Sequence, residues 1–248
     1  MGWVKPILLA TLLISSFLVG CLSNDEGVVE LKFTHTSLSG EVLESYSDGN
    51  LVSELHFTVE FDFSCSDSNY KIEYFSVGVD DGRESIDLSA KSGSVISIDF
   101  SSHGMYEVKL SAFDEKGNSD TKQVTVAVDL RIDWREEATS NPMVLQFDPN
   151  PKNGGENPKH IDVSSTVENP SFVEDFSGGQ SVEFLWKITD ELDDVCQWNT
   201  GEVDDGQAQT WNTLHFNTYL IHELSVDYEE GQDLINIDQT VLITYDFD

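Results

Sequence analysis

The sequence predicts an all-β protein with two tandem β-sandwich domains after an N-terminal signal peptide. Apolar and polar residues alternate with a period of two through most of the chain, and helical periodicity is nearly absent. Clusters of Gly, Asp, Asn and Pro separate the alternating runs. Alternation is typical of strands that bury one face, and successive strands without intervening helices favour antiparallel sandwiches. The 248 residues suffice for one large or two small domains.

The first 21 residues predict export and lipid anchoring. Lys5 precedes an apolar run, Ile7–Val19, that is shorter than the about 20 residues a membrane-spanning helix needs. The tetrapeptide 18–21 (Leu-Val-Gly-Cys) resembles the lipobox of prokaryotic lipoproteins, which implies a lipid on Cys21. An ordinary signal peptide followed by a chance cysteine stays open. We expect a signal peptide in residues 1–20, a lipidated cysteine and tether in 21–29, and a location outside the cytoplasmic membrane.

The expected first domain spans residues 30–130. Strands are predicted over the alternating runs 55–63, 106–112 and 124–134. The last run crosses the expected domain boundary near residues 129–135 without a Gly, Ser or Pro linker. We therefore expect one strand to pass directly into the next domain and to make a fairly stiff tandem.

The expected second domain spans residues 131–248. Strands are predicted over 182–188 and 235–247, with Gln239 as the one break in the alternation of the latter. Pro149–Pro158, which contains three prolines, is expected to be an exposed loop.

The segment Ser102–Gly117 resembles the closing hairpin of a PKD domain. Gly104, Tyr106, Val108 and Leu110 alternate as in that family, and Asp114 with a Gly-containing turn follows. Residues 74–82 are similar to the family's aromatic strand, with Tyr74 or Phe75 where Trp is usual and extra residues before Asp81-Gly82. The resemblance covers residues 55–128.

The PKD resemblance implies an immunoglobulin-like sandwich with a spacer, adhesion or carbohydrate-associated role on archaeal or bacterial surfaces. Independently, Tyr106 is expected to bury its ring and bond to backbone across a corner. Gly104 and Gly117 stand where turns need a positive φ. The second domain is interpreted as another immunoglobulin-like sandwich.

The charge of the chain excludes one class of partner. It carries 46 acidic and 13 basic side chains, a net charge of −33. Such a field repels phosphate backbones, so no nucleic-acid partner is expected. Glu60 and Asp62 alternate with apolar residues, so the acids are expected to coat an apolar core, as suits salty, archaeal or marine surroundings.

Two metal interpretations follow from the polar residues. Carboxylates could gather around Ca²⁺, for which the candidates are Asp80, Asp81 and Asp114 and, in the second domain, Asp193, Asp194, Asp204 and Asp205. Ordinary solvated turns are the alternative. Zinc is not expected, because no His-x-x-x-His pattern lies on a helix and no cysteine pair lies near a histidine.

Two of the histidines have expected environments. His103 is expected to make a structural hydrogen bond, and His222 is expected to face solvent.

The tryptophans and cysteines raise two further questions, sugar stacking and a disulfide bond. Trp198 and Trp211 could stack on sugar rings, with filling of the core between the sheets as the alternative. No disulfide is expected between Cys65 and Cys196, because an end-to-end tandem places them too far apart.

The sequence therefore predicts a surface lipoprotein with a structural, adhesion or interaction role and no catalysis. Nucleophile motifs and phosphate-binding loops are absent from it. The alternative is a calcium- or carbohydrate-binding accessory module of a surface degradation system. The expected partners are the membrane, through the lipid on Cys21, and an extracellular protein or glycan. No cofactor is expected other than calcium.

Removing salt should lower the melting temperature, because screening limits the repulsion among 46 acidic side chains. Calorimetry in about 0.02 M and about 1 M NaCl checks this expectation. A melting temperature that does not change between the two solutions would contradict it.

Overall fold

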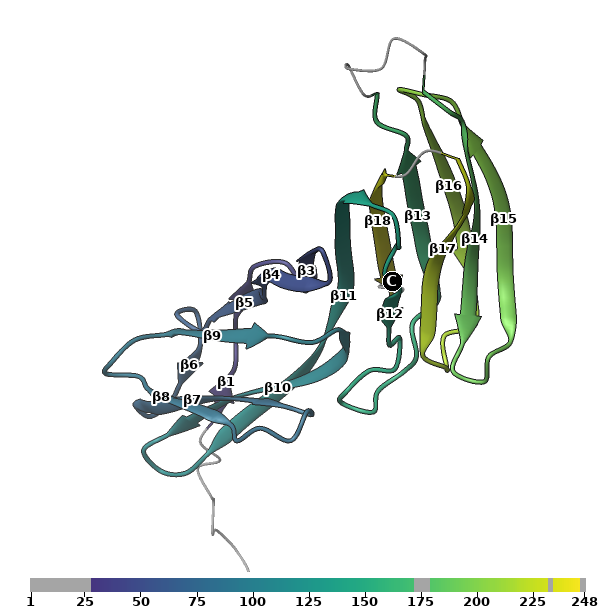
Figure 1. Ribbon diagram of the computed structural model, residues 1–248. Coiled ribbons are helices and arrows are strands. Elements are labelled where there is room, and N and C mark those ends of the chain that lie inside the picture. The colour runs from purple at the N-terminus through teal and green to yellow at the C-terminus, as the bar shows by residue number, and fades with distance from the viewer. Residues whose placement is uncertain (1–27, 172–178, 232–233, 246–248) are drawn as a thin grey trace, which may run out of the picture.

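The computed structural model describes residues 28–171, 179–231 and 234–245 (Figure 1). These residues form strands and turns without any helix, which confirms the all-β prediction. None of the elements in these three ranges is a helix able to cross a membrane. The predicted signal peptide, residues 1–20, and the predicted lipidation site, Cys21, lie outside the described residues.

The first sandwich packs a three-stranded sheet, β2–β5–β9, against the strands β8–β7–β10–β11. A short β1–β6 pair and the β3–β4 hairpin complete it. Its strands are β1 (Val29–Glu30), β2 (Thr34–His35), β3 (Ser39–Ser47), β4 (Asn50–Leu55), β5 (Phe57–Asp62), β6 (Asp67–Ser68), β7 (Ile72–Val79), β8 (Ile86–Ser89), β9 (Val95–Phe100), β10 (Gly104–Asp114) and β11 (Ser119–Thr139).

The second sandwich packs the strands β16–β13–β18–β11 against a four-stranded sheet, β12–β17–β14–β15. Its remaining strands are β12 (Leu145–Phe147), β13 (His160–Glu168), β14 (Val182–Asp190), β15 (Val195–Val203), β16 (Ala208–His215), β17 (His222–Glu230) and β18 (Ile235–Thr244).

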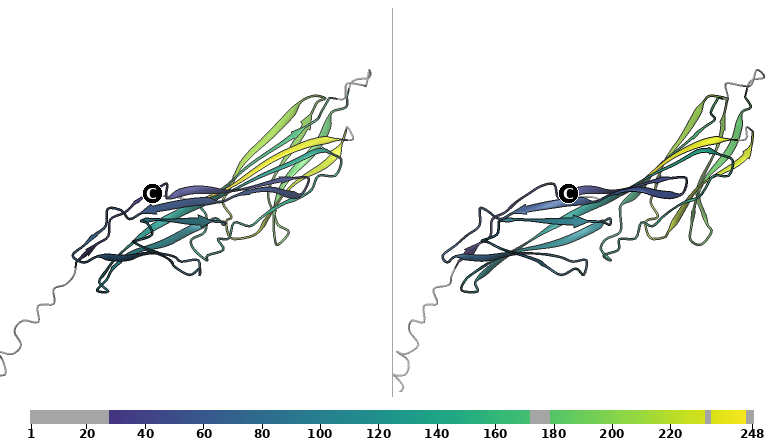
Figure 2. Two further views of the ribbon diagram at one scale, coloured as in Figure 1. Left: turned by 90° about the vertical axis from the view of Figure 1, so that its left-hand side faces the viewer. Right: turned by 60° about the vertical axis from the view of Figure 1, so that its left-hand side comes forward.

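One strand, β11, belongs to both sandwiches. Up to Val128 it pairs with β10, and from Leu130 onwards it pairs with β18. Along Ala127–Arg135 its other edge is covered by β3, which runs parallel to it. One hydrophobic cluster continues across this junction, from Val108 and Val126 to Ile161 and Ile243. The two sandwiches follow each other along the long axis of the molecule (Figure 2).

The corner before β10 forms as the sequence predicts. Tyr106 is buried, and its hydroxyl donates a 2.7 Å hydrogen bond to the carbonyl oxygen of Ser102. Gly104 has φ 154° and Gly117 has φ 82°, conformations that residues with a Cβ rarely adopt. Tyr106 thus fixes the corner by the same bond as in other sandwiches.

The predicted strand over 55–63 is in fact two strands. Leu55 ends β4, which pairs with β3, whereas Phe57 begins β5, which pairs with β9 in the opposite sheet. The chain changes sheet at His56, so Leu55 is exposed although its alternation matches the buried residues of β5. Within β5 the prediction holds, because Val59 and Phe61 are buried and Glu60 is exposed.

The loop Pro149–Pro158 is exposed over residues 154–157, as its composition predicts, but it also packs against the first sandwich. Its three prolines are buried, and the Asn153 amide donates a 2.7 Å hydrogen bond to the carbonyl oxygen of Met105 in the first sandwich. Beside this loop, His103 Nε2 lies 3.2 Å from the Asp148 carbonyl oxygen, and its Nδ1 lies 2.8 Å from the Tyr245 hydroxyl. The prediction of a structural hydrogen bond at His103 is confirmed.

Gln239 breaks the alternation of β18 because it serves a buried polar contact. The side chain is buried and donates a 3.2 Å hydrogen bond to Ser165 Oγ. The same oxygen accepts a 2.9 Å hydrogen bond from Trp186 Nε1. Trp186 therefore satisfies its indole N–H inside the core.

Acid should weaken the junction around His103. Burial lowers the pKa of His103, so below about pH 6.5 the unfolded chain takes up a proton that the folded chain resists, and stability falls. We expect His103→Gln to cost about 1–3 kcal/mol at neutral pH and to flatten this loss on acidification. Thermal unfolding between about pH 7.5 and about pH 5.5 measures both effects.

His56 provides a control of opposite sign. Hydrogen bonds that the ring donates to the carboxylates of Asp99 and Glu54 raise the pKa of His56, so its protonation stabilises the folded chain as the pH falls. His56→Gln should therefore steepen the acid loss. Equal pH profiles for His103→Gln and the unaltered chain would contradict the role assigned to His103.

Candidate functional site

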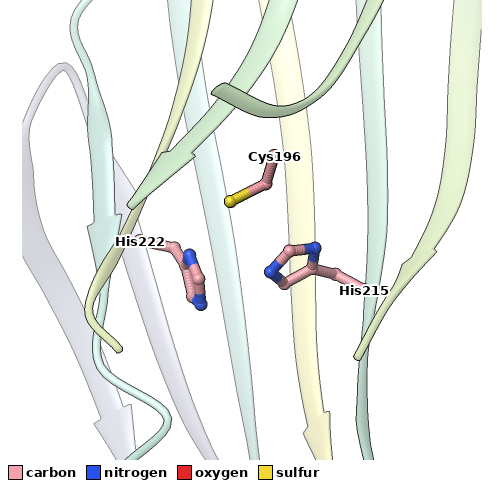
Figure 3. A group of neighbouring side chains, drawn as sticks. All are labelled: Cys196, His215 and His222. Atoms are coloured by element: carbon pink, nitrogen blue, oxygen red, sulfur yellow. The ribbon is translucent and has the colours of Figure 1, made fainter. Parts of the chain in front are cut away.

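Three potential metal ligands meet at one end of the second sandwich. Cys196 lies at the start of β15, His215 ends β16, and His222 begins β17. One ligand atom from each of them lies within 4.8 Å of the other two. Figure 3 shows the Cys196 thiol pointing towards the gap between the two imidazole rings. Both histidines are buried and the cysteine is half-buried.

The group assembles because its members come from both sheets. His215 stands opposite Ile161 of β13 in one sheet, whereas His222 stands opposite Asp190 of β14 in the other. In the β14–β15 ladder the register shifts between Ile188 and Thr189. This irregularity leaves Cys196 beside the buried Asp190 at the hairpin end.

The hydrogen bonds of His222 define its tautomer. Its Nε2 lies 2.8 Å from the carbonyl oxygen of Asn217, and because a carbonyl only accepts, Nε2 carries the hydrogen. Nδ1 then holds a lone pair, is buried, and has no hydrogen-bond partner among the described residues. His215 Nε2 is likewise buried without a partner there. The two rings meet edge to face, with centroids 4.5 Å apart.

Burial favours the uncharged forms of His215 and Cys196 at neutral pH. Burial and the neighbouring His222 lower the pKa of His215 to about 4. Burial and Asp190 raise the pKa of the Cys196 thiol. That thiol lies 3.8 Å from Asp190 Oδ2 and 3.6 Å from the carbonyl oxygen of Asp194.

Asp190 is itself held in place by the turn after β14. Its Oδ1 accepts the amide hydrogens of Leu192, at 2.9 Å, and Asp194, at 3.1 Å. The other carboxylate oxygen, Oδ2, is therefore left to accept the contact from the Cys196 thiol. One sulfur and two imidazole nitrogens are the ligand types of zinc and copper sites, not of calcium or magnesium sites.

The three aspartates predicted to bind calcium do not come together. Asp80 follows β7 and accepts the amide hydrogen of Glu107, and Asp81 pairs with Arg83. Asp114 stands opposite Ile72, at the other end of the β7–β10 ladder. In the second sandwich, Asp193-Asp194 and Asp204-Asp205 likewise flank opposite ends of β15. Calcium binding stays a prediction from the sequence.

The two tryptophans predicted to stack on sugars have different environments. Trp198 is 66% exposed, on the outer face of β15 opposite Lys187. Trp211 packs against both hydrophobic clusters, with its ring centroid 6.1 Å from that of Trp186. Only Trp198 is therefore placed to meet a ligand.

The structure places Cys65 and Cys196 in different sandwiches and His222 in the core. Cys65 and Cys196 are free thiols, the first exposed in the turn after β5 and the second in the other sandwich. The prediction that His222 faces solvent is wrong, because its side chain is fully buried. It shares the inward phase of Leu224 and Val226, and this alternation was the signal that could have revealed it.

Comparison with known proteins adds little to what the residues themselves show about the site. No family model matches the chain, and no curated protein matches it. The PKD resemblance of residues 55–128 therefore stays a prediction.

Among solved structures, the chain is similar to a carbohydrate-binding module of the β-sandwich superfamily, at TM-score 0.34 and 13% identity over 87% of this chain and 97% of that one. It is similar to β-glucuronidase 2 of Bacteroides uniformis at TM-score 0.29 and 8% identity, over 90% of this chain and 30% of that one. A third is SGBP-B of the Bacteroides ovatus mixed-linkage glucan utilization locus, at TM-score 0.19 and 9% identity, over 81% of this chain and 52% of that one. Because these TM-scores are below 0.5, the functional argument rests on the chain's own residues.

Proposed function

We propose that the protein is an exported lipoprotein, anchored through Cys21, with a non-catalytic structural or binding role. In this role the first sandwich is a stiff spacer, and the second sandwich is the part presented to partners. Two features of the sequence support the anchor: the lipobox-like residues 18–21, and the short apolar run Ile7–Val19 before them, which is typical of a signal peptide.

The observation that carries this proposal is the continuity of β11. The backbone N–H of Leu31, close to where the tether enters, donates a 2.9 Å hydrogen bond to Asp120 near the start of β11. The second sandwich begins at Leu130, where β18 joins the strand. The ten residues between them span roughly 33 Å of extended chain. Leu31, near the start of the described chain, therefore lies at the end of the first sandwich that faces away from the second.

The cavities support a non-catalytic role. Two of them lie near the junction, at His103 and at Arg83, with volumes of about 160 and 140 Å³. Both are smaller than the about 300 Å³ at which small-molecule sites begin. A third, of about 550 Å³, exceeds that size, but it lies open over the outer face of β13, β16 and β18 around Ser164 and Leu214. An open sheet face of this kind suits contact with a macromolecule better than enclosure of a reacting group.

Carbohydrate binding is a second candidate, and Trp198 is the observation that favours it. The exposed indole lies on a sheet face beside the ion pair between Lys187 and Asp227. A flat aromatic ring flanked by polar groups provides both stacking and hydrogen bonds for a sugar ring.

Cys21→Ala should release the protein from the membrane. The variant lacks the thiol that would carry the lipid, and hydrocarbon chains supply the membrane affinity of a lipoprotein. Fractionation of a prokaryotic host, with fatty-acid labelling of the protein, measures the result. The matched control is Cys65→Ala, which should stay labelled and membrane-bound. A Cys21→Ala chain that remains with the membrane would exclude this anchor.

Trp198→Ala should lower the affinity for any glycan that the protein binds by at least about tenfold. A glycan array on the full chain identifies the ligand, and titration calorimetry compares the variants. Tyr219→Ala is the matched control, because Tyr219 is also 66% exposed but lies in the β16–β17 loop. An array without binding, or equal affinity in both variants, rejects the carbohydrate candidate and leaves the anchored spacer untouched.

A further inference from the structure

We propose that Cys196, His215 and His222 bind one divalent transition-metal ion of the zinc class. This inference goes beyond the proposed function and does not depend on the membrane anchor. It rests on the convergence of the three side chains between the sheets and on one buried nitrogen in each imidazole ring that has no hydrogen-bond partner among the described residues.

The spacing of the ligand atoms suits a metal after a small movement. Zinc bonds to sulfur are about 2.3 Å long and bonds to nitrogen about 2.0–2.1 Å, so tetrahedral ligands lie about 3.3–3.6 Å apart. The three atoms here lie within 4.8 Å of one another. A contraction of at most about 1.5 Å closes the site. Cys196, half-buried beside a register shift at a hairpin end, has the freedom to supply most of it.

The two histidines provide an independent observation. His215 is 4% exposed and His222 is 0% exposed, yet His215 Nε2 and His222 Nδ1 have no hydrogen-bond partner among the described residues. Buried nitrogens of this kind are uncommon, because an unmade hydrogen bond is costly. One metal ion would satisfy both lone pairs together.

The surroundings of His222 match those of a metal ligand. Metal-binding histidines usually donate their other ring N–H to a carbonyl or carboxylate, which fixes the ring and its tautomer. His222 Nε2 does so to the Asn217 carbonyl oxygen, at 2.8 Å. Phe147 packs against the same ring, with centroids 5.6 Å apart. The lone pair of Nδ1 is therefore held in position before any ion arrives.

Charge balance selects a divalent ion. When the metal binds, the thiol proton leaves to solvent and Cys196 becomes a thiolate, with Asp190 Oδ2 3.8 Å away. A thiolate and a carboxylate together carry two negative charges, which a divalent ion neutralises in a site that burial makes intolerant of net charge. Sulfur and imidazole ligands exclude calcium and magnesium by softness. The Asp190 carboxylate is also a candidate for a fourth ligand.

The test uses the full chain in detergent with the substitutions Cys21→Ala and Cys65→Ser, which leave Cys196 as the only thiol of the three. Calcium at millimolar concentration is added to compete with zinc for the surface carboxylates. Titration with zinc chloride, followed by calorimetry and elemental analysis, should give one tightly bound zinc per chain. At about 100 times Kd, zinc should raise the melting temperature by about 5–10 °C.

Cobalt reports on the sulfur directly. Cobalt(II) in the zinc site should give a thiolate-to-cobalt charge-transfer band in the near ultraviolet, which zinc then abolishes by displacement. In this chain the band can come only from Cys196. It should be absent from Cys196→Ser, and His215→Gln and His222→Gln should each weaken zinc binding by at least about 100-fold. His56→Gln, an exposed histidine between two carboxylates, should leave both readouts unchanged.

Three results would overturn the inference. They are the absence of tight zinc binding, binding without the cobalt–sulfur band, and binding of copper but not of zinc. If Cys196→Ser fails to fold, as judged by its melting curve, the cobalt spectrum of the single-thiol chain still decides the matter.

Discussion

The hydrogen-bonded ladders of β11 are the constraint on which the rest of the structure depends. The strand exchanges β10 for β18 between Val128 and Leu130, while β3 covers its second edge across the exchange. Both sandwiches therefore share a sheet, and one hydrophobic cluster runs through the junction. The loop that carries Asp148 can then pack on the first sandwich, where the Asp148 carbonyl oxygen accepts a hydrogen bond from His103 Nε2. A flexible linker at the same place would leave these polar contacts to form anew at each encounter.

Much of this architecture could be predicted from the sequence, because a period of two is a strong local signal. The uninterrupted run 124–134 predicted a strand through the domain boundary, and the motif around Tyr106 predicted the corner bond. The change of sheet at His56 could not be predicted, since alternation continues through it and only the partner strand differs. The burial of the three prolines in the loop Pro149–Pro158 could not be predicted either, because composition reports local conformation and not what a loop packs against.

The cluster of Cys196, His215 and His222 also could not be predicted from the sequence. Searches for zinc ligands rely on short spacings within one helix or one turn. Here His215 and His222 lie in opposite sheets, and Cys196 reaches them only through a shift of register. The alternation of His222 with Glu223 and its phase with Leu224 were visible, but they indicate burial and not a partner. Tertiary packing supplies the partner, and only a structure reveals it.

The direction of β11 also has a mechanical consequence. Leu31 is fastened beside the start of β11, and the second sandwich is fastened to its later half. A pull between the proposed anchor at Cys21 and a partner on the second sandwich would therefore run along the strand. The ladder hydrogen bonds lie across that direction, so the load falls on many of them in shear at once and does not open them one by one. A chain built in this way resists extension most strongly along β11, which is the direction in which the proposed anchor and a partner would pull.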